Sequence, residues 1–204
     1  MRLDALPINA FDVLLFVVLM FGLSRGRKHG MSEELLNLLQ WFCIVVGCAV
    51  LYEPLGKFLE GTTPFSLLTS YVVVYLAVLL IIFSVFAIFR RTIGGKLIGS
   101  DMFGKSEYYL GMFSGAVRFA CIAIAGLALL NARYFSQTEV RAMQKYQDDV
   151  YGSDFFPGLH SIQTTVFQQS LTGPWIKDNL GLLLIKPTQP ADKSLHQREY
   201  MLPE

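Results

Sequence analysis

Residues 65–89 form the feature that most constrains this chain, because 25 successive residues carry no charged side chain. The run ends abruptly at the pair Arg90 and Arg91. A helix needs roughly 20 apolar residues to cross the ~30 Å hydrocarbon core of a bilayer. This stretch is therefore expected to be a transmembrane helix. Three further apolar stretches have about the length of a span, at residues 6–23, 35–52 and 110–130.

The composition agrees with a chain of this kind, since 53% of the residues are hydrophobic and 16% are charged. Soluble domains are usually less apolar and more charged. The apolar blocks lie between residues 6 and 130, whereas residues 131–204 resemble ordinary polar protein. We therefore expect an all-α polytopic membrane protein with about four transmembrane helices in residues 1–130. Residues 131–204 are expected to form a short amphipathic, partly disordered extramembrane tail.

The first stretch, residues 6–23, could also be the apolar region of a cleaved signal peptide. The residues before it include Arg2 and Asp4 and so carry no net positive charge. Residues 21–27 lack the small-x-small pattern of a cleavage site. We therefore interpret this stretch as a helix of the mature protein.

Positively charged residues in the predicted loops indicate the orientation, because Lys and Arg in short loops remain cytoplasmic. The N-terminus has only Arg2 and the second loop only Lys57. With four spans, both termini and the whole tail are then expected on the outer side, which in a bacterium is the periplasm. The first and third loops, which are expected to be cytoplasmic, hold the remaining charges: Arg25, Arg27, Lys28, Arg90, Arg91, Lys96 and Lys105.

Charge and residue spacing argue against several classes of function. A net charge of +1 and the lack of a basic, aromatic-rich patch argue against nucleic acid as a partner. His29, His160 and His196 are far apart, and the cysteines lie in apolar blocks, so no metal or cofactor is expected. No Ser/His/Asp or Cys/His arrangement is evident, and the protein is not expected to be an enzyme.

Residues 99–106 match the phosphate-binding pattern G-x-x-x-x-G-K-[ST] literally. A working phosphate-binding loop joins a buried strand to a helix within an α/β domain. The match lies instead in a short loop between two predicted spans. We interpret it as a glycine-rich connector and not as a nucleotide site.

Ionisable side chains in the predicted spans are functional candidates, since they are costly in lipid and are usually paired. Arg118 lies roughly 12 Å into its span at 1.5 Å per residue, and Glu33 and Glu34 open another span at the same face. A pair between Arg118 and one of these carboxylates is possible, and snorkelling of Arg118 to the headgroups is the alternative. For Asp12, a solvated or Asn9-bonded carboxylate is favoured over a proton relay.

Two patterns of helical spacing predict contacts between the spans. Glu33, Asn37, Gln40 and Gly47 share a face, which is most simply explained by hydrogen bonds between helices, although it could line a polar path. The G-x-x-x-G of the last span predicts a packing surface, because small residues let helices approach closely in lipid. Spacing does not tell whether that surface meets another span or another copy of the chain.

The tail is expected to contain two amphipathic helices. Ser136 and Glu139 form a predicted capping box that begins the first. The second covers residues 162–171 and is expected to close at Gly173 and Pro174. Such helices could lie on the membrane surface or dock a partner helix. Residues 187–204 are expected to be disordered.

Motifs at the ends of these spans resemble the CvpA family, the colicin V production proteins of bacterial inner membranes. The family opens with an Asp, here Asp12, and has a loop R-G-x-x-x-G-x-x-x-E-L-L, matched by residues 25–36. It also has an acidic residue followed by L-G-x-x-x-G-x-x-R-G, which corresponds to residues 107–119, with Phe119 in place of the last glycine. The resemblance covers residues 11–130 and includes Gly26, Gly30, Glu34, Gly111, Gly115 and Arg118.

The resemblance implies an inner-membrane protein required for colicin V production or export and for envelope homeostasis. Similar four-span segments also anchor periplasmic serine proteases, which suggests a module that holds or signals to a partner. We therefore expect a noncatalytic protein that contacts the lipid bilayer and envelope protein partners, and a homo-oligomer is compatible with this role. The alternative is a small oligomeric channel or transporter with a path lined by Asp12, Asn37, Gln40 and Arg118.

Overall fold

The structure, a computed structural model, describes residues 9–98, 104–135, 140 and 158–188. Three helices are long and apolar enough to cross a membrane: α1 (Ala10–Thr62), the first part of α2 (Leu67–Ile98) and α3 (Glu107–Asn131). The remaining named helices of the described chain are short: η2 (Gly104–Ser106), α5 (Leu159–Phe167), α6 (Thr172–Leu180) and η3 (Gly181–Leu183). The predicted all-helical membrane fold is confirmed.

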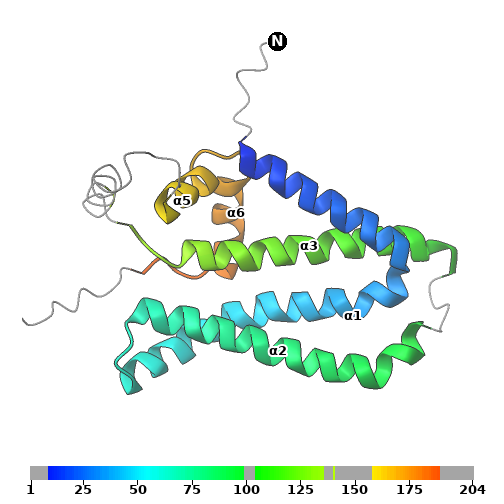
Figure 1. The fold of residues 1–204 in the computed structure, drawn as a ribbon, viewed down its shortest axis with the longest axis horizontal. Helices are drawn as coiled ribbons and strands as arrows, with labels where there is room; N and C mark the ends of the chain where they lie inside the picture. Colours follow the sequence, from blue (N-terminus) through cyan, green and yellow to red (C-terminus); the bar gives the residue numbers. More distant parts are fainter. Residues whose placement is uncertain (1–8, 99–103, 136–139, 141–157, 189–204) are drawn as a thin grey trace, which may run out of the picture.

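Helix α1 supplies two legs of the bundle and not one. Its 53 residues would form a rod of about 80 Å at 1.5 Å per residue, far longer than the ~30 Å hydrocarbon core. At Gly30 the backbone has φ 71° and ψ 174°, values outside the helical region, and the chain reverses there (Figure 1). Residues 10–29 form the first arm and residues 31–62 the second. Three long helices therefore correspond to the four predicted spans.

The bundle has two ends, which we name by what they contain. The turn end holds Gly30 and the start of α3, and the tail end holds the start of α1 together with α5 and α6 (Figure 1). Both arms of α1 run alongside α3, and α2 packs on the second arm. Large apolar side chains such as Phe16, Val50 and Phe113 are exposed along the outside of the bundle. Such a surface suits lipid and not water.

The main hydrophobic core lies toward the tail end and is built by both the spans and the tail. Tyr52, Tyr75 and Ala128 from the long helices are buried in one cluster with Phe167 and Ile185 from the tail. Tyr52 and Tyr71 stack edge to face within it, with ring centroids 5.4 Å apart. The described part of the tail thus folds back onto the membrane helices.

The tail differs from its prediction in one respect. The second amphipathic stretch forms α5, but this helix ends at Phe167, and Gly173 and Pro174 lie in the first turn of α6. A proline is tolerated in the first turn because its missing N–H has no intrahelical partner there. Gly173 allows the turn to pack closely, since a Cβ at this position would collide with the carbonyl oxygen of Val166. The glycine and proline therefore begin a helix instead of closing one.

Three other predictions fall mainly outside the described residues. The helix beginning at Ser136 is one of them, and so is the larger part of the phosphate-loop match, of which residues 104–106 form η2. Most of the segment expected to be disordered from residue 187 also lies outside. Thr188 is described, and the prediction of disorder is wrong for this residue. It forms an isolated bridge with Arg133. Its N–H donates to the Ala132 carbonyl at 2.9 Å.

Candidate functional site

Four glycines hold the first arm of α1 directly against α3. A Cβ at Gly111 would lie 2.5 Å from the carbonyl oxygen of Gly26, and one at Gly22 would lie 2.8 Å from that of Gly115. Because such distances are below any normal contact, only glycine fits at these positions. The G-x-x-x-G surface of α3 is therefore occupied by another span of the same chain.

Phe119, which replaces the glycine usual in the resembling family, lies at the edge of this contact. Its side chain would meet a Cβ at Gly22 at 3.0 Å, and its ring stacks on that of Phe21 with centroids 5.4 Å apart. The glycine that permits close approach is thus on the facing helix. The two helices remain close at this level although one of them carries an aromatic side chain.

Glu107 supports the reversal at Gly30 from the facing helix. The backbone N–H of Ser32 donates to Glu107 Oε1 at 3.4 Å, and a Cβ at Gly30 would lie 2.8 Å from Glu107 Cγ. The second arm of α1 begins here, so its first N–H groups lack helical partners and carry partial positive charge. A carboxylate at this point stabilises them. The sequence resemblance includes Glu107 as the acidic residue before the L-G-x-x-x-G motif, but it assigns no role to this side chain.

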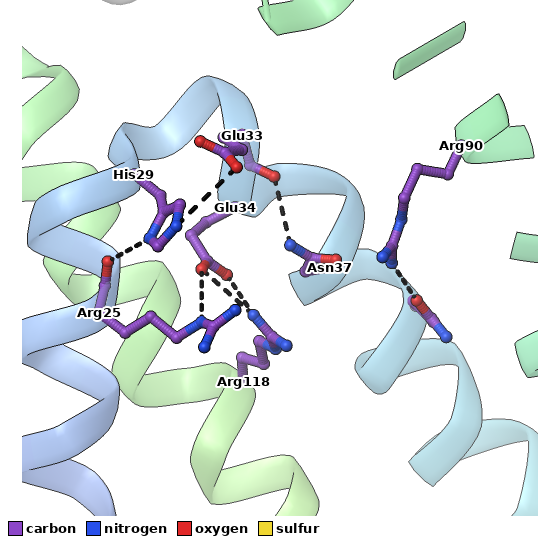
Figure 2. A network of polar contacts seen from close by, with 8 residues as sticks. Arg25, His29, Glu33, Glu34, Asn37, Arg90 and Arg118 are labelled. Carbon is purple, nitrogen blue, oxygen red and sulfur yellow. Dashed lines mark hydrogen bonds and ion pairs between the residues drawn. The ribbon is translucent and has the colours of Figure 1, made fainter. Parts of the chain in front are cut away.

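A buried ion pair lies just beyond the turn. Arg118 Nη1 donates to Glu34 Oε2 at 2.8 Å and to Oε1 at 3.2 Å, so of the two alternatives left open for Arg118 the structure shows the ion pair (Figure 2). Arg25 Nε lies 3.9 Å from Glu34 Oε1, so two guanidinium groups converge on one carboxylate. Glu34 is only 1% exposed. Removal of Arg118 would leave Glu34 buried with only the more distant Arg25 nearby, and the loss of one partner of a buried pair costs about 3–5 kcal/mol.

His29 and Glu33 form an outer layer over this ion pair. His29 Nδ1 is 2.9 Å from the Arg25 carbonyl oxygen, and its Nε2 is 4.0 Å from Glu33 Oε1 (Figure 2). Both side chains are partly exposed. The outer layer therefore adds contacts at the turn but does not share the burial of Glu34.

The residues predicted to share one face of the second arm contact different partners. Gln40 is buried and its Oε1 accepts a hydrogen bond from Arg90 Nη2 of α2 at 2.7 Å. Asn37 instead donates to the Glu33 carbonyl within its own helix at 3.4 Å. At Gly47 a Cβ would lie 2.8 Å from Ile82 Cδ1, so this position serves apolar packing. The hydrogen bond between helices is confirmed for Gln40.

Asp12 belongs to the tail end, far from the ion pair. Its Oδ2 accepts from the Asn9 N–H at 3.0 Å in a capping box, so the predicted bond to Asn9 is confirmed. The same carboxylate accepts from the N–H groups of Leu171 and Thr172 at 3.0 Å and from Thr172 Oγ1 at 2.6 Å. Asp12 thus caps α6 as well as α1. No pattern near Thr172 indicated this contact in the sequence.

A second set of contacts fastens the tail to the other arm. Asn131 Nδ2 donates to the Ile185 carbonyl at 2.9 Å, and the Lys186 N–H donates to the Tyr52 hydroxyl at 3.3 Å. Glu53 accepts from Lys186 Nζ and Lys57 Nζ, each at 2.8 Å. The hydrogen bond to Glu53 raises the pKa of Lys186. The candidate residues therefore separate into a turn-end group and a tail-end group.

Neither group has the form of a metal centre. Across the described ranges no three His, Cys, Asp or Glu side chains are placed to hold a metal ion. Cys43, Cys48 and Cys121 are free thiols in or beside the apolar core. The two groups hold helices together through hydrogen bonds and ion pairs.

Comparison with known proteins gives one clear match. A family model described as Colicin V production protein matches residues 11–176. The match passes residue 130, where the resemblance seen in the sequence ended, and it reaches into α6. Searches of curated proteins and of solved structures gave no significant match. Since the family model covers most of the chain, the protein belongs to the colicin V production protein family.

Proposed function

We propose that this protein is a noncatalytic scaffold of the bacterial inner membrane that acts through envelope protein partners. Membership of the colicin V production family and the membrane-spanning helices support this role. The processes proposed are colicin V production or export and envelope homeostasis. In this arrangement the two arms of α1, α2 and α3 cross the membrane, and both termini lie in the periplasm.

The observation that carries the proposal is the pairing of polar side chains within the chain. Glu34 is paired with Arg118, Gln40 with Arg90, and Asp12 with the start of α6. A conducting path requires polar groups that face water along its length. In the described part of the chain these groups face one another instead. This favours a packed scaffold over the channel or transporter alternative.

The tail supplies the surface on which we expect partners to dock. Leu182 is 90% exposed, and Trp175 and Leu171 are also exposed. Exposed aromatic and aliphatic side chains next to polar ones are typical of protein-binding surfaces. The tail is held to the spans by Asp12 and Asn131, so a partner bound there would be positioned relative to the membrane.

Site-specific photocrosslinking in cells tests the proposal. A photoreactive amino acid at Leu182 is expected to trap envelope proteins, whereas the same group at Val50, an exposed residue of the second arm, should trap mainly lipid. The parallel readout is colicin V secretion by cells that lack their own family member and carry these variants. Crosslinks only to further copies of the chain, together with ion flux in liposomes, would instead support the channel.

Reporter fusions test the proposed orientation in the membrane. A reporter that is active only in the periplasm, fused after the last residue, is expected to be active. A matched fusion in the loop that contains residues 99–103 is expected to be inactive. The opposite pattern would reverse the proposed orientation.

A further inference from the structure

A cavity of about 200 Å³ lies at the tail end, where the end of α3 meets α5, α6 and Pro187. Its lining includes Arg133, His160 and Lys177 together with the side-chain amides of Gln163 and Gln168. No Asp or Glu is among the described residues that line it. The described lining therefore carries positive charge and no carboxylate.

In the described part of the chain, Arg133 and Lys177 of this cavity lie over aromatic rings. The guanidinium of Arg133 lies 4.7 Å from the centre of the Phe135 ring, and Lys177 Nζ lies 5.9 Å from that of Phe167. His160 packs edge-on against the same Phe135 ring, with centroids 5.4 Å apart. Within the described chain, Arg133 Nε is buried and has no hydrogen-bond partner. Such a donor is costly unless a ligand satisfies it.

Carbonyl groups at the end of α3 would normally oppose an anion, since a helix C-terminus carries partial negative charge. Here they already accept hydrogen bonds. Gln163 Nε2 donates to the Leu130 and Arg133 carbonyls at 3.2 and 2.9 Å, and the Thr188 N–H donates to the Ala132 carbonyl at 2.9 Å. Among the described residues that line the cavity, the charges without a carboxylate partner are those of Arg133 and Lys177.

The length of α3 would place the cavity near the lipid headgroups if this helix crosses the membrane. Helix α3 has 25 residues and so is about 37 Å long, which exceeds the ~30 Å hydrocarbon core. Its end at Asn131 borders the cavity. Tyr134, which lines the cavity, has an exposed fraction of 48%. Aromatic side chains of this kind are typical of the membrane interface.

We propose that this cavity binds the phosphate of an anionic membrane lipid in the leaflet at the tail end. Arg133 donates to the phosphate oxygens from a guanidinium fixed on Phe135, and Lys177 supplies a second charge. Guanidinium groups bind phosphate in a planar, bidentate manner. The bound lipid would join α3 to α5 and α6 and so stabilise the docked tail.

Native mass spectrometry of the full-length, delipidated protein tests this site. The protein is titrated with phosphatidylglycerol, which is anionic, and with phosphatidylcholine, which is zwitterionic. The wild type is expected to bind phosphatidylglycerol more tightly. Arg133→Gln should weaken the tightest-bound lipid roughly tenfold, because a charge-assisted hydrogen bond is lost. Lys28→Gln, which removes an exposed positive charge at the turn end, is the matched control and should have no effect.

Other outcomes would overturn the proposal. They are an unchanged affinity in Arg133→Gln, an equal loss in Lys28→Gln, and displacement of the lipid by millimolar inorganic phosphate, which would identify a free anion as the ligand. If Arg133→Gln does not fold, Lys177→Gln provides the same comparison at an exposed position. Arg133→Lys should bind with intermediate affinity, because it keeps the charge but loses the planar guanidinium.

Discussion

The turn end and the tail end of the bundle are held by opposite means. At the turn end, backbone meets backbone through glycines, and the buried contacts are between charges, as at Gly26, Gly111 and the pair of Glu34 with Arg118. At the tail end, a cluster of large apolar side chains is buried and the charged groups lie around it. The first arrangement depends on geometry and allows little adjustment, whereas the second can repack. Substitutions should therefore be tolerated unequally at the two ends.

The largest expected effect follows Gly26→Leu at the turn end. Any Cβ at this position collides with the Gly111 carbonyl, and the backbone cannot move without opening the turn. We expect a loss of several kcal/mol and little folded protein. Gly126→Ala is the control, since nothing lies within 4 Å of a Cβ there, and it should be neutral or slightly stabilising. Each variant is heated in detergent, and the folded protein that remains is then measured by size-exclusion chromatography.

Arg118→Leu should be the next most damaging substitution. It leaves the Glu34 carboxylate buried with only the more distant Arg25 nearby, so a loss of about 3–5 kcal/mol is expected. The double variant Glu34→Gln with Arg118→Leu should recover part of that loss, because no charge is then left unpaired. If the double variant were as unstable as the sum of the two single ones, the pair would not be coupled.

Asp12→Asn addresses the tail end. The substitution removes charge-assisted hydrogen bonds to the start of α6, which should cost about 1–3 kcal/mol. We expect the loss to appear as local release of α5 and α6, measured as faster hydrogen exchange there with little change near Gly30. Uniformly faster exchange in all helices would contradict a separate tail-end unit.

Glu107→Gln should give the converse pattern, with faster exchange confined to the turn.

The smallest effect is expected at the exposed ion pair of Lys186 and Glu53. Because the pKa of Lys186 is raised in the folded protein, its contribution is present below the ordinary lysine pKa. It is lost as the pH rises through the raised value. Lys186→Gln should therefore leave stability at neutral pH almost unchanged and flatten the decline at alkaline pH. An unfolding series between pH 7 and pH 11 measures this.

The spans could be predicted because hydropathy reports burial in lipid directly, and the run at residues 65–89 indicates its helix without further information. The pair of Arg118 with Glu34 could be anticipated only as one of two alternatives, because residues near the same face of the membrane can either pair or extend to the headgroups. The contact of Asp12 with α6 could not, since the partners are 160 residues apart and no local pattern encodes it. The partner of the α3 glycines was also undetermined, because their spacing suits any close helix.

The bond between Asp12 and Thr172 also sets an order of events during synthesis. A ribosome adds about 5–20 residues per second. Thr172 follows Asp12 by 160 positions, so it is synthesised roughly ten seconds or more after the first arm. During that interval the carboxylate has only its local bond to Asn9. Closure of the tail end is therefore among the last steps of maturation, and a chain cut short before α6 would keep its membrane helices but leave this carboxylate uncapped by the tail.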